Sequence, residues 1–300
     1  MTDIHSNQYD ALIIGGGFAG LSAAIWLGRF HRSVLVISKG PTRNADSEVM
    51  HGYPGLDNCS PGELLQRMQT EAASYGAEFI EAWALNVKRN SNNFCIETNQ
   101  GTYSGKHLLI ATGTADVHPS FPGFEDCVGT SAWHCPACDG HEYTDKQIAI
   151  VGWHKDIVGY AEEFMVYTDP SNITIYIEGH DLPRKVLQQA DEHNIRVVRQ
   201  KIKKLRRSEG SLHTIELEDG SEQSADALFY NIEQKARLEL FEQLGCELAD
   251  GAVQVNQQQE TSIKGVYAAG DITPFEDLVV VACSTGAIAA SSIHEKLGTS

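Results

Sequence analysis

Two cysteines separated by two residues, Cys135 and Cys138, are the side chains of this sequence best suited to chemistry. The chain has 300 residues and seven cysteines, an odd number in a chain too long to depend on a disulfide scaffold. Only these two lie within three positions of each other. In a reducing cytosol, such a pair more often serves redox chemistry or metal binding than structure.

The residues around the pair favour redox chemistry. Pro136 suits the first turn of a helix that begins at the first cysteine. The N-terminus of a helix lowers the pKa of a thiol and so increases the fraction of thiolate, the reactive form. Asp139 follows the second cysteine directly, where it can act as a general acid for a leaving thiolate. We therefore predict that Cys135, Cys138 and Asp139 are catalytic.

Three other interpretations of the pair stay open from the residues alone. Covalent haem attachment needs a histidine directly after the second cysteine, where this chain has Asp139. A zinc site could use both cysteines with His134 and His141, but eight contiguous residues make a poor tetrahedral cage, and no second close pair exists. The third interpretation is two inert thiols. We expect no bound metal.

The elements that must position this pair begin with a glycine-rich turn near the N-terminus. Gly15, Gly17 and Gly20 allow a tight turn and a close approach to a pyrophosphate, and the following helix N-terminus stabilises the phosphate charge. The flanking residues predict a strand–helix–strand unit, which implies a parallel sheet. We expect its strand, helix and second strand over 9–14, 21–29 and 33–37.

The end of the second strand departs from the usual dinucleotide-binding pattern. An acidic residue commonly binds a ribose hydroxyl there, but this chain has Ser38. Ser38 can still hydrogen-bond a hydroxyl, and Arg43, next to Asn44, can meet a phosphate in bidentate fashion. A solvated Arg43 without a ligand is the alternative.

The middle of the chain indicates a second nucleotide-binding-like domain inserted into the first. Another strand–turn–helix pattern starts there, and candidate linkers flank it at 114–119 and 231–237. The tail then returns with a strand ending at Ala269 and a helix over 284–296. For the inserted block we expect strands at 147–151, 173–177, 195–199, 212–218 and 226–230, and a helix at 157–167.

Two more strand ends run through small residues into glycine, as Ala111-Thr112-Gly113 and as Gly270-Asp271. With the first glycine turn, they resemble the three FAD-binding signatures of flavoproteins that have two dinucleotide-binding domains. In that family the residue matching Asp271 bonds the ribityl chain of FAD, and the following helix points its N-terminus at the flavin. The resemblance implies FAD, rather than a nicotinamide nucleotide, at this site.

The segment Cys-Pro-Ala-Cys-Asp-Gly, together with the FAD segments, resembles low-molecular-weight thioredoxin reductases over essentially the whole chain. The resemblance implies that Cys138 lies next to the flavin, that Cys135 attacks a thioredoxin-like protein disulfide, and that Asp139 is the acid. It also implies a homodimer. The stretch Thr42-Arg43-Asn44 with His51-Gly52 is more similar to the related dithiol oxidases.

The expected fold is therefore α/β, with an FAD-binding domain (1–117 and 235–300) interrupted by a smaller Rossmann-like domain (118–234) that carries the cysteine pair. The expected FAD-binding residues are Gly15, Gly17, Phe18, Ala19, Gly20, Ser38, Arg43, Asn44, His51, Ala111, Thr112, Gly113, Gly270, Asp271, Val279 and Val280.

Two departures from the family concern the electron donor. Reductases that use NADPH have glycines in the turn of the inserted domain where this chain has Trp153 and His154, and a tryptophan would fill the space of a pyrophosphate. Where the family has the arginines that bind the NADP 2′-phosphate, this chain has Glu178-Gly179-His180, and a carboxylate repels that phosphate. In the tail, an apolar run replaces the family's Arg-Gln-Ala. We predict a donor other than NADPH; unusual NADPH binding is the alternative.

The charge of the chain bears on its partners. A net charge of −17 disfavours nucleic acid and anionic membranes. No apolar run reaches the length of a membrane span, and residues 1–10 are polar, so we expect a cytoplasmic protein. A basic run at 199–207 could steer an acidic ferredoxin as donor, or be a solvated strand and turn. A dithiol oxidase that passes electrons to oxygen is the rival function.

Overall fold

The computed structural model describes residues 4–90 and 93–298, and these divide into two compact units. Within the described residues, the first unit takes the positions up to 45, then 53–115, and those from 236 onward. The second unit takes 46–52 and 116–235. The main boundaries lie beside the expected ones, but the short segment 46–52 groups with the second unit, which the sequence did not indicate.

The first unit is built on a seven-stranded sheet in the order β3-β2-β1-β6-β5-β4, with β19 also paired to β6. Strands β3, β2, β1, β6 and β19 are parallel neighbours, and the hairpin β4–β5 continues the sheet antiparallel. The bounds are β1 Ile4–Ile14, β2 Val34–Ser38, β3 Glu78–Glu81, β4 Ala84–Asn90, β5 Asn93–Thr98, β6 Gly101–Ile110 and β19 Val266–Ala268.

Strand β6 pairs with β1 along one edge and with two different strands along the other. Gly101 to Gly105 pair with β5, and Leu108 to Ile110 pair with β19. Its last three side chains, like the Leu12 and Ile13 side chains of β1, are fully buried. Such continuous apolar runs are typical of parallel strands that are covered on both faces. The carboxyl ends of β1, β6 and β19 therefore lie side by side.

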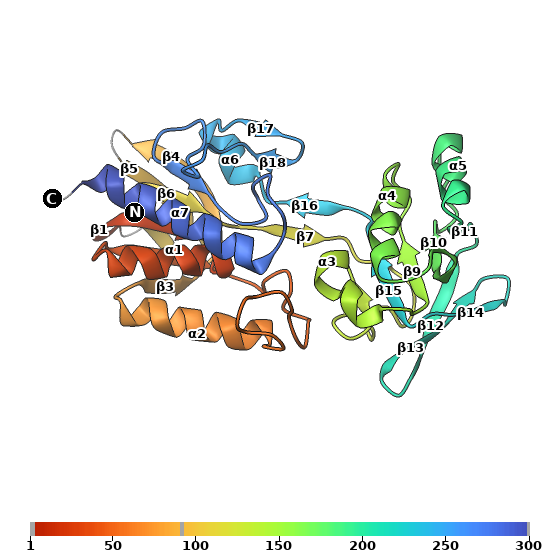
Figure 1. The fold of residues 1–300 in the computed structure, drawn as a ribbon. Helices are drawn as coiled ribbons and strands as arrows, with labels where there is room; N and C mark the ends of the chain where they lie inside the picture. The colour runs from red at the N-terminus through yellow and green to blue at the C-terminus, as the bar shows by residue number, and fades with distance from the viewer. Residues whose placement is uncertain (1–3, 91–92, 299–300) are drawn as a thin grey trace. The chain divides into compact units, whose positions relative to one another are not determined.

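Helices α1 (Phe18–Arg29) and α7 (Val279–Leu297) run alongside each other in the first unit, as Figure 1 shows in red and blue. Their backbones approach closely, since a Cβ added to Gly286 would lie 2.1 Å from the carbonyl oxygen of Ala19. Helix α7 begins five residues before the expected start at 284. The remaining elements are α2 Pro61–Ser74, α6 Glu239–Leu244, β17 Leu248–Ala249 and β18 Ala252–Val253.

The second unit has a five-stranded parallel sheet in the order β11-β10-β9-β15-β8. Its strands are β8 Ala132–Trp133, β9 Ile148–Val151, β10 Ile173–Tyr176, β11 Arg196–Val198 and β15 Ala227–Tyr230. The helices are α3 Pro136–Asp139, α4 Ile157–Glu162 and α5 Arg184–Glu192, and the 3₁₀ turns are η1 Gly140–Tyr143, η2 Glu163–Val166 and η3 Pro170–Asn172. The helix expected over 157–167 thus tightens into η2 after residue 162.

A separate antiparallel sheet of the second unit contains β12 Ile202–Ser208, β13 Ser211–Leu217 and β14 Glu222–Ser224. Both expected linkers include a short strand, β7 Thr114–Asp116 and β16 Gln234–Ala236, and these two strands pair. Within the described part of the chain, no helix is long and apolar enough to cross a membrane.

Candidate active site

The three glycines of the turn between β1 and α1 have different surroundings, as the sequence pattern predicts. A Cβ on Gly15 would lie 2.1 Å from the carbonyl oxygen of Ala111, and one on Gly20 would lie 1.9 Å from that of Gly15, so both positions are closed by the protein itself. A Cβ on Gly17 would meet only a Thr42 methyl, at 3.8 Å. This open side of Gly17 is where a pyrophosphate can reach the backbone.

The N-terminus of α1 is left without side-chain partners. Its N-cap is Gly17, no side chain caps it, and its first turn contains no acidic residue. The first backbone N–H groups of a helix have no partners inside the helix. Phe18 and Ala19 bury their side chains and so contribute only their backbone here. The turn is suited to bind a phosphate group.

The residues after β2 form a polar group beside this turn. The Ser38 hydroxyl oxygen lies 2.9 Å from the position of a Gly16 Cβ, so Ser38 borders the turn directly. Arg43 Nη1 lies 3.2 Å from Asp271 Oδ2 and 2.6 Å from Asp277 Oδ2. The Asn44 side-chain oxygen accepts a hydrogen bond from Thr42 at 3.2 Å. Arg43 is thus held by two carboxylates, and a phosphate would compete with them for its guanidinium group.

The two other segments that resemble FAD-binding signatures, Ala111-Thr112-Gly113 and Gly270-Asp271, follow the ends of the neighbouring strands β6 and β19. Gly113 has a φ of +63° and nothing within 4 Å of its Cβ position, which leaves open space beside Thr112. Gly270, at φ +78°, donates its N–H to the Thr285 hydroxyl of α7 at 3.0 Å. Burial and the nearby Asp277 raise the pKa of Asp271, while Arg43 lowers it.

Helix α7 presents a second free N-terminus to the same unit. It starts at Val279 after the N-cap Leu278, which makes no capping hydrogen bond, and its first turn has no acidic residue. Val280 is 37% exposed. The first turn therefore offers backbone N–H groups within an apolar surface, which suits the uncharged edge of a ring system better than a second phosphate.

The redox pair lies in the second unit as a Cys135–Cys138 disulfide, with a Cα–Cα distance of 5.3 Å. Cys135 is the N-cap of α3, and its sulfur accepts the N–H of Cys138 at 3.1 Å. Pro136 occupies the first helical position, as expected. Helix α3 has only four residues. After reduction of the disulfide, this N–H group would be placed to stabilise a Cys135 thiolate, whereas so short a helix supplies less dipole than the sequence suggested.

The pKa of the Asp139 carboxyl is shifted toward neutral pH. Burial raises its pKa to about 7, Glu142 adds to the rise, and His51 opposes it. A carboxyl group with a pKa near the working pH can both give and regain a proton. His51 belongs to segment 46–52, and its Nε2 lies 3.7 Å from Glu142 Oε1 in the second unit.

Among the described residues, five cysteines are free. Burial raises the pKa of the Cys127 and Cys246 thiols, and that of Cys283 to about 11. A raised pKa leaves almost no thiolate at neutral pH, so these three thiols are poor nucleophiles.

The turn after β9 is occupied by the protein's own side chains. The Trp153 ring stacks on His180 with centroids 4.2 Å apart and an interplanar angle of 11°. A Cβ on Gly152 would lie 2.4 Å from the Asn231 carbonyl oxygen, so no space opens there either. Glu178 accepts the N–H of Ile202 at 2.8 Å. The stack connects the turn after β9 with the residues after β10, two places where a dinucleotide normally contacts this fold. Sequence reasoning missed this contact.

Four cations of the basic run form ion pairs within the chain. Lys203, Lys204 and Arg206 all pair with Glu216, the first two at 2.7 and 3.4 Å. Hydrogen bonds from Lys203 and Arg206 lower the pKa of Glu216 to about 2. Arg199 pairs with Asp181 at 3.3 Å. Lys203, Lys204 and Arg206 belong to strand β12, and their partner Glu216 lies on the neighbouring strand β13, which favours the solvated-strand interpretation over a dedicated docking site.

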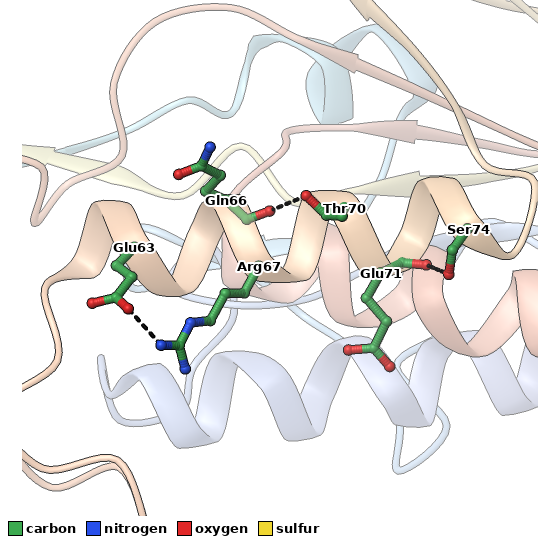
Figure 2. Close-up of a pocket in the computed structure, with 6 residues that line it drawn as sticks. All are labelled: Glu63, Gln66, Arg67, Thr70, Glu71 and Ser74. Carbon is green, nitrogen blue, oxygen red and sulfur yellow. Dashed lines mark hydrogen bonds and ion pairs between the residues drawn. The ribbon is translucent and has the colours of Figure 1, made fainter.

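A shallow hollow on the exposed side of α2 contains none of the predicted site residues. Its polar groups largely satisfy one another: Arg67 binds Glu63, Thr70 donates to the Gln66 carbonyl, and Ser74 donates to the Glu71 carbonyl, as Figure 2 shows. The hollow is lined by Glu63, Gln66, Arg67, Thr70, Glu71 and Ser74.

An open glycine turn, two free helix N-termini and a CxxC disulfide with an adjacent acid define a flavoprotein disulfide oxidoreductase. Residues 9–153 and 163–286 match the family model described as pyridine nucleotide-disulphide oxidoreductase, and the chain belongs to that family. It is 31% identical over 307 residues to thioredoxin reductase sirT of Leptosphaeria maculans, covering 95% of this chain and 93% of the relative.

Two solved structures superpose on nearly the whole of this chain. The crystal structure of HlmI superposes with a TM-score of 0.91 at 29% identity, covering 99% of this chain and 95% of that one. The putative thioredoxin reductase TrxB of Bacillus anthracis gives 0.87 at 26% identity, covering 96% and 98%. The predicted α/β fold, the resemblance to thioredoxin reductases and the FAD cofactor are confirmed.

The open side of Gly17 yields a test of the FAD site. We expect Gly17→Val to fold normally but to purify without FAD. The protein leaves room for the valine side chain, but that side chain would fill the space that the pyrophosphate needs. The visible spectrum after heat release measures FAD per chain, and circular dichroism reports the fold. The control is Gly62→Ala, at another open glycine. Full FAD content in Gly17→Val would show that the cofactor does not contact this turn.

Proposed function

We propose that this enzyme takes electrons from a donor other than a nicotinamide nucleotide and passes them, through FAD and Cys135–Cys138, to a protein disulfide. The observation that carries the proposal is the half-buried disulfide with Asp139 directly beside it, whose pKa is about 7. A thiol pair, a backbone donor for one sulfur and an acid titrating near neutrality are the components that thiol–disulfide exchange needs.

The exchange is balanced in atoms and electrons. The Cys135 thiolate attacks one sulfur of the acceptor disulfide and releases the other as a thiolate, forming a mixed disulfide. Cys138 then loses its proton and attacks the Cys135 sulfur, which re-forms the enzyme disulfide and releases the second acceptor sulfur. The acceptor gains two electrons and two protons, and the enzyme dithiol loses the same. Bound FAD supplies the two electrons that regenerate the dithiol.

Asp139 gives and takes the protons of this exchange. Below its pKa of about 7 it is mostly protonated and can protonate a departing thiolate. Above that pH it is mostly a carboxylate, and it can then take the proton of a thiol but no longer give one. The rate of acceptor reduction should therefore fall as the pH rises through about 7.

The choice of donor rests on the second unit. The Trp153–His180 stack occupies the turn that would cradle a pyrophosphate, and Glu178 adds a carboxylate where a 2′-phosphate would lie. Both features oppose NADPH. Ferredoxin is the donor that we propose to test first, although the pairing of Lys203, Lys204 and Arg206 with Glu216 weakens the reason to place its docking there.

The other parts of the proposal come from the sequence and from the family resemblance. We propose a homodimer in the cytoplasm and a thioredoxin-like acceptor. The FAD-binding roles of the residues after β2, β6 and β19 belong to the proposal as well, with Arg43 and Asp271 acting as one paired unit.

One experiment separates this function from its rival. The enzyme is supplied with small dithiols while oxygen uptake is recorded, and in parallel an artificial one-electron donor drives the reduction of an oxidised thioredoxin-like protein under argon. We expect protein disulfide reduction and little oxygen uptake. Rapid oxygen uptake with dithiols and an unreduced protein disulfide would instead establish a dithiol oxidase.

A further inference from the structure

The residue before the redox helix is held by a buried tyrosine. Tyr160 belongs to α4, which lies beside the start of α3 (Figure 1), and its hydroxyl donates to the His134 carbonyl oxygen at 3.0 Å. Tyr160 is 8% exposed, and its ring packs edge-on against the buried Phe164 with centroids 5.7 Å apart. The peptide bond between His134 and Cys135 is therefore anchored to the core of the second unit.

The Tyr160 hydroxyl keeps its proton throughout the neutral range and so remains a donor. Burial raises the pKa of Tyr160 well above its ordinary value. The charges of four nearby groups add to the rise, namely Glu163, Tyr230, Asp116 and Asp139. The hydrogen bond to the His134 carbonyl is thus available at every pH at which thiol–disulfide exchange is measured.

A second tyrosine fixes the strand just before this peptide. The Tyr143 hydroxyl of η1 accepts the Trp133 Nε1–H at 3.0 Å and donates to the Thr130 carbonyl oxygen at 3.1 Å. Strand β8 and η1 therefore hold each other on either side of the cysteine pair. His134, the next residue after β8, is held by Tyr160 instead.

The anchored peptide bears on Cys135 because Cys135 is the N-cap of α3. An N-cap residue has an extended backbone, here φ −118° and ψ 107°, and its side chain accepts an N–H of the first turn, here that of Cys138 at 3.1 Å. The φ angle of Cys135 is measured against the His134–Cys135 peptide plane, so the plane that Tyr160 holds helps to set where the sulfur lies. The disulfide bond restrains the same sulfur, but only until it is reduced.

We propose that Tyr160 is a positioning residue for Cys135, which keeps its sulfur beside the Cys138 N–H once the disulfide is reduced. The inference rests on the proposed function, in which Cys135 is the attacking sulfur. An N–H beside the sulfur favours the thiolate over the thiol. Stabilising the reduced form raises the reduction potential of the pair. Tyr160 itself gives no proton and forms no bond to the acceptor.

The first test measures that potential. Holoenzyme is equilibrated in dithiothreitol redox buffers and quenched, and mass spectrometry reads the state of Cys135–Cys138. We expect Tyr160→Phe to shift the dithiol–disulfide equilibrium about threefold to tenfold toward the disulfide, a potential lower by about 15–30 mV for this two-electron couple. The matched control is Tyr176→Phe, which removes another buried hydroxyl of the second unit, one that donates to Gln223 Oε1 at 2.8 Å. Melting temperatures show whether the two variants lose similar stability.

Two outcomes of this measurement overturn the proposal. The first is a wild-type potential in Tyr160→Phe. The second is an equal shift in Tyr176→Phe, which would show that the loss of any buried hydroxyl of the second unit has the same effect.

The second test reads the reactivity of Cys135 at a fixed pH of about 7, near the ordinary range of enzyme action. Reduced holoenzyme is treated briefly with iodoacetamide, and peptide mapping locates the label, with the free Cys95 as internal reference. We expect Cys135 to be labelled first in wild type and in Tyr176→Phe, and about threefold to tenfold more slowly in Tyr160→Phe. Equal Cys135 rates in wild type and Tyr160→Phe refute the positioning role. Label that appears first on Cys138 contradicts the proposed function instead, and the potential then decides the role of Tyr160.

Discussion

Replacing either Cys135 or Cys138 with serine will reduce disulfide turnover to the background rate while leaving FAD bound. Exchange needs one sulfur to attack and a second to resolve the mixed disulfide, so neither cysteine can complete a cycle alone. The measurement is turnover of a small aromatic disulfide, with FAD content read from the visible spectrum. Cys95→Ser is the matched control, because Cys95 is a free, partly exposed cysteine in the first unit.

The two variants should differ in whether they accumulate a mixed disulfide with the substrate. Cys138→Ser keeps the attacking sulfur, and we expect it to accumulate a mixed disulfide at Cys135 that mass spectrometry detects. Cys135→Ser should accumulate none, because the sulfur whose thiolate the Cys138 N–H stabilises is gone. If Cys95→Ser or Cys283→Ser is the damaging change instead, the redox pair has been assigned wrongly.

NADPH at low micromolar concentration will reduce the bound flavin slowly or not at all. Each charge-assisted phosphate contact that is lost removes about 1.5–3 kcal/mol of binding free energy. The Trp153 ring, which fills the turn after β9, and the Glu178 carboxylate together remove more than one such contact. Their loss moves the dissociation constant for NADPH from micromolar toward millimolar. Stopped-flow absorbance under argon measures this, with NADH and reduced ferredoxin tested in separate runs.

Two outcomes decide the donor. Bleaching of the flavin within a second of mixing would restore an ordinary NADPH-dependent reductase. Slow bleaching by NADPH with fast reduction by ferredoxin supports the proposal. Trp153→Gly should accelerate reduction by NADPH only in part, because Glu178 stays in place and still repels the 2′-phosphate.

The first dinucleotide site was predictable because its signals are local. Gly15, Gly17 and Gly20 lie within six consecutive residues, and the strand before them and the helix after them are strongly apolar, so spacing alone indicates the turn. Cys135, Pro136 and Cys138 are equally local. In both cases the predicted site residues are neighbours in the chain, and they lie in a strand–helix turn and at a helix start, respectively.

The features that the sequence did not reveal depend on distant partners. Lys204 and Glu216 lie opposite each other in the β12–β13 hairpin, and without that register the basic run resembles an uncompensated patch. Trp153 and His180 stack across two turns of the fold. Segment 46–52 has no periodic pattern, and its contact with Gly129 is between backbones, which side-chain reasoning does not detect.

An anaerobic reductive titration of the purified holoenzyme tests the central claim most directly. If the Cys135–Cys138 disulfide is in redox exchange with bound FAD, wild-type enzyme will take up two electrons for the flavin and two more for the disulfide before the spectrum stops changing. Alkylation and mass spectrometry will then find both cysteines as thiols. Cys135→Ser and Cys138→Ser will take up only the flavin's two electrons. A wild-type enzyme that takes up two electrons and keeps its disulfide intact would contradict the account.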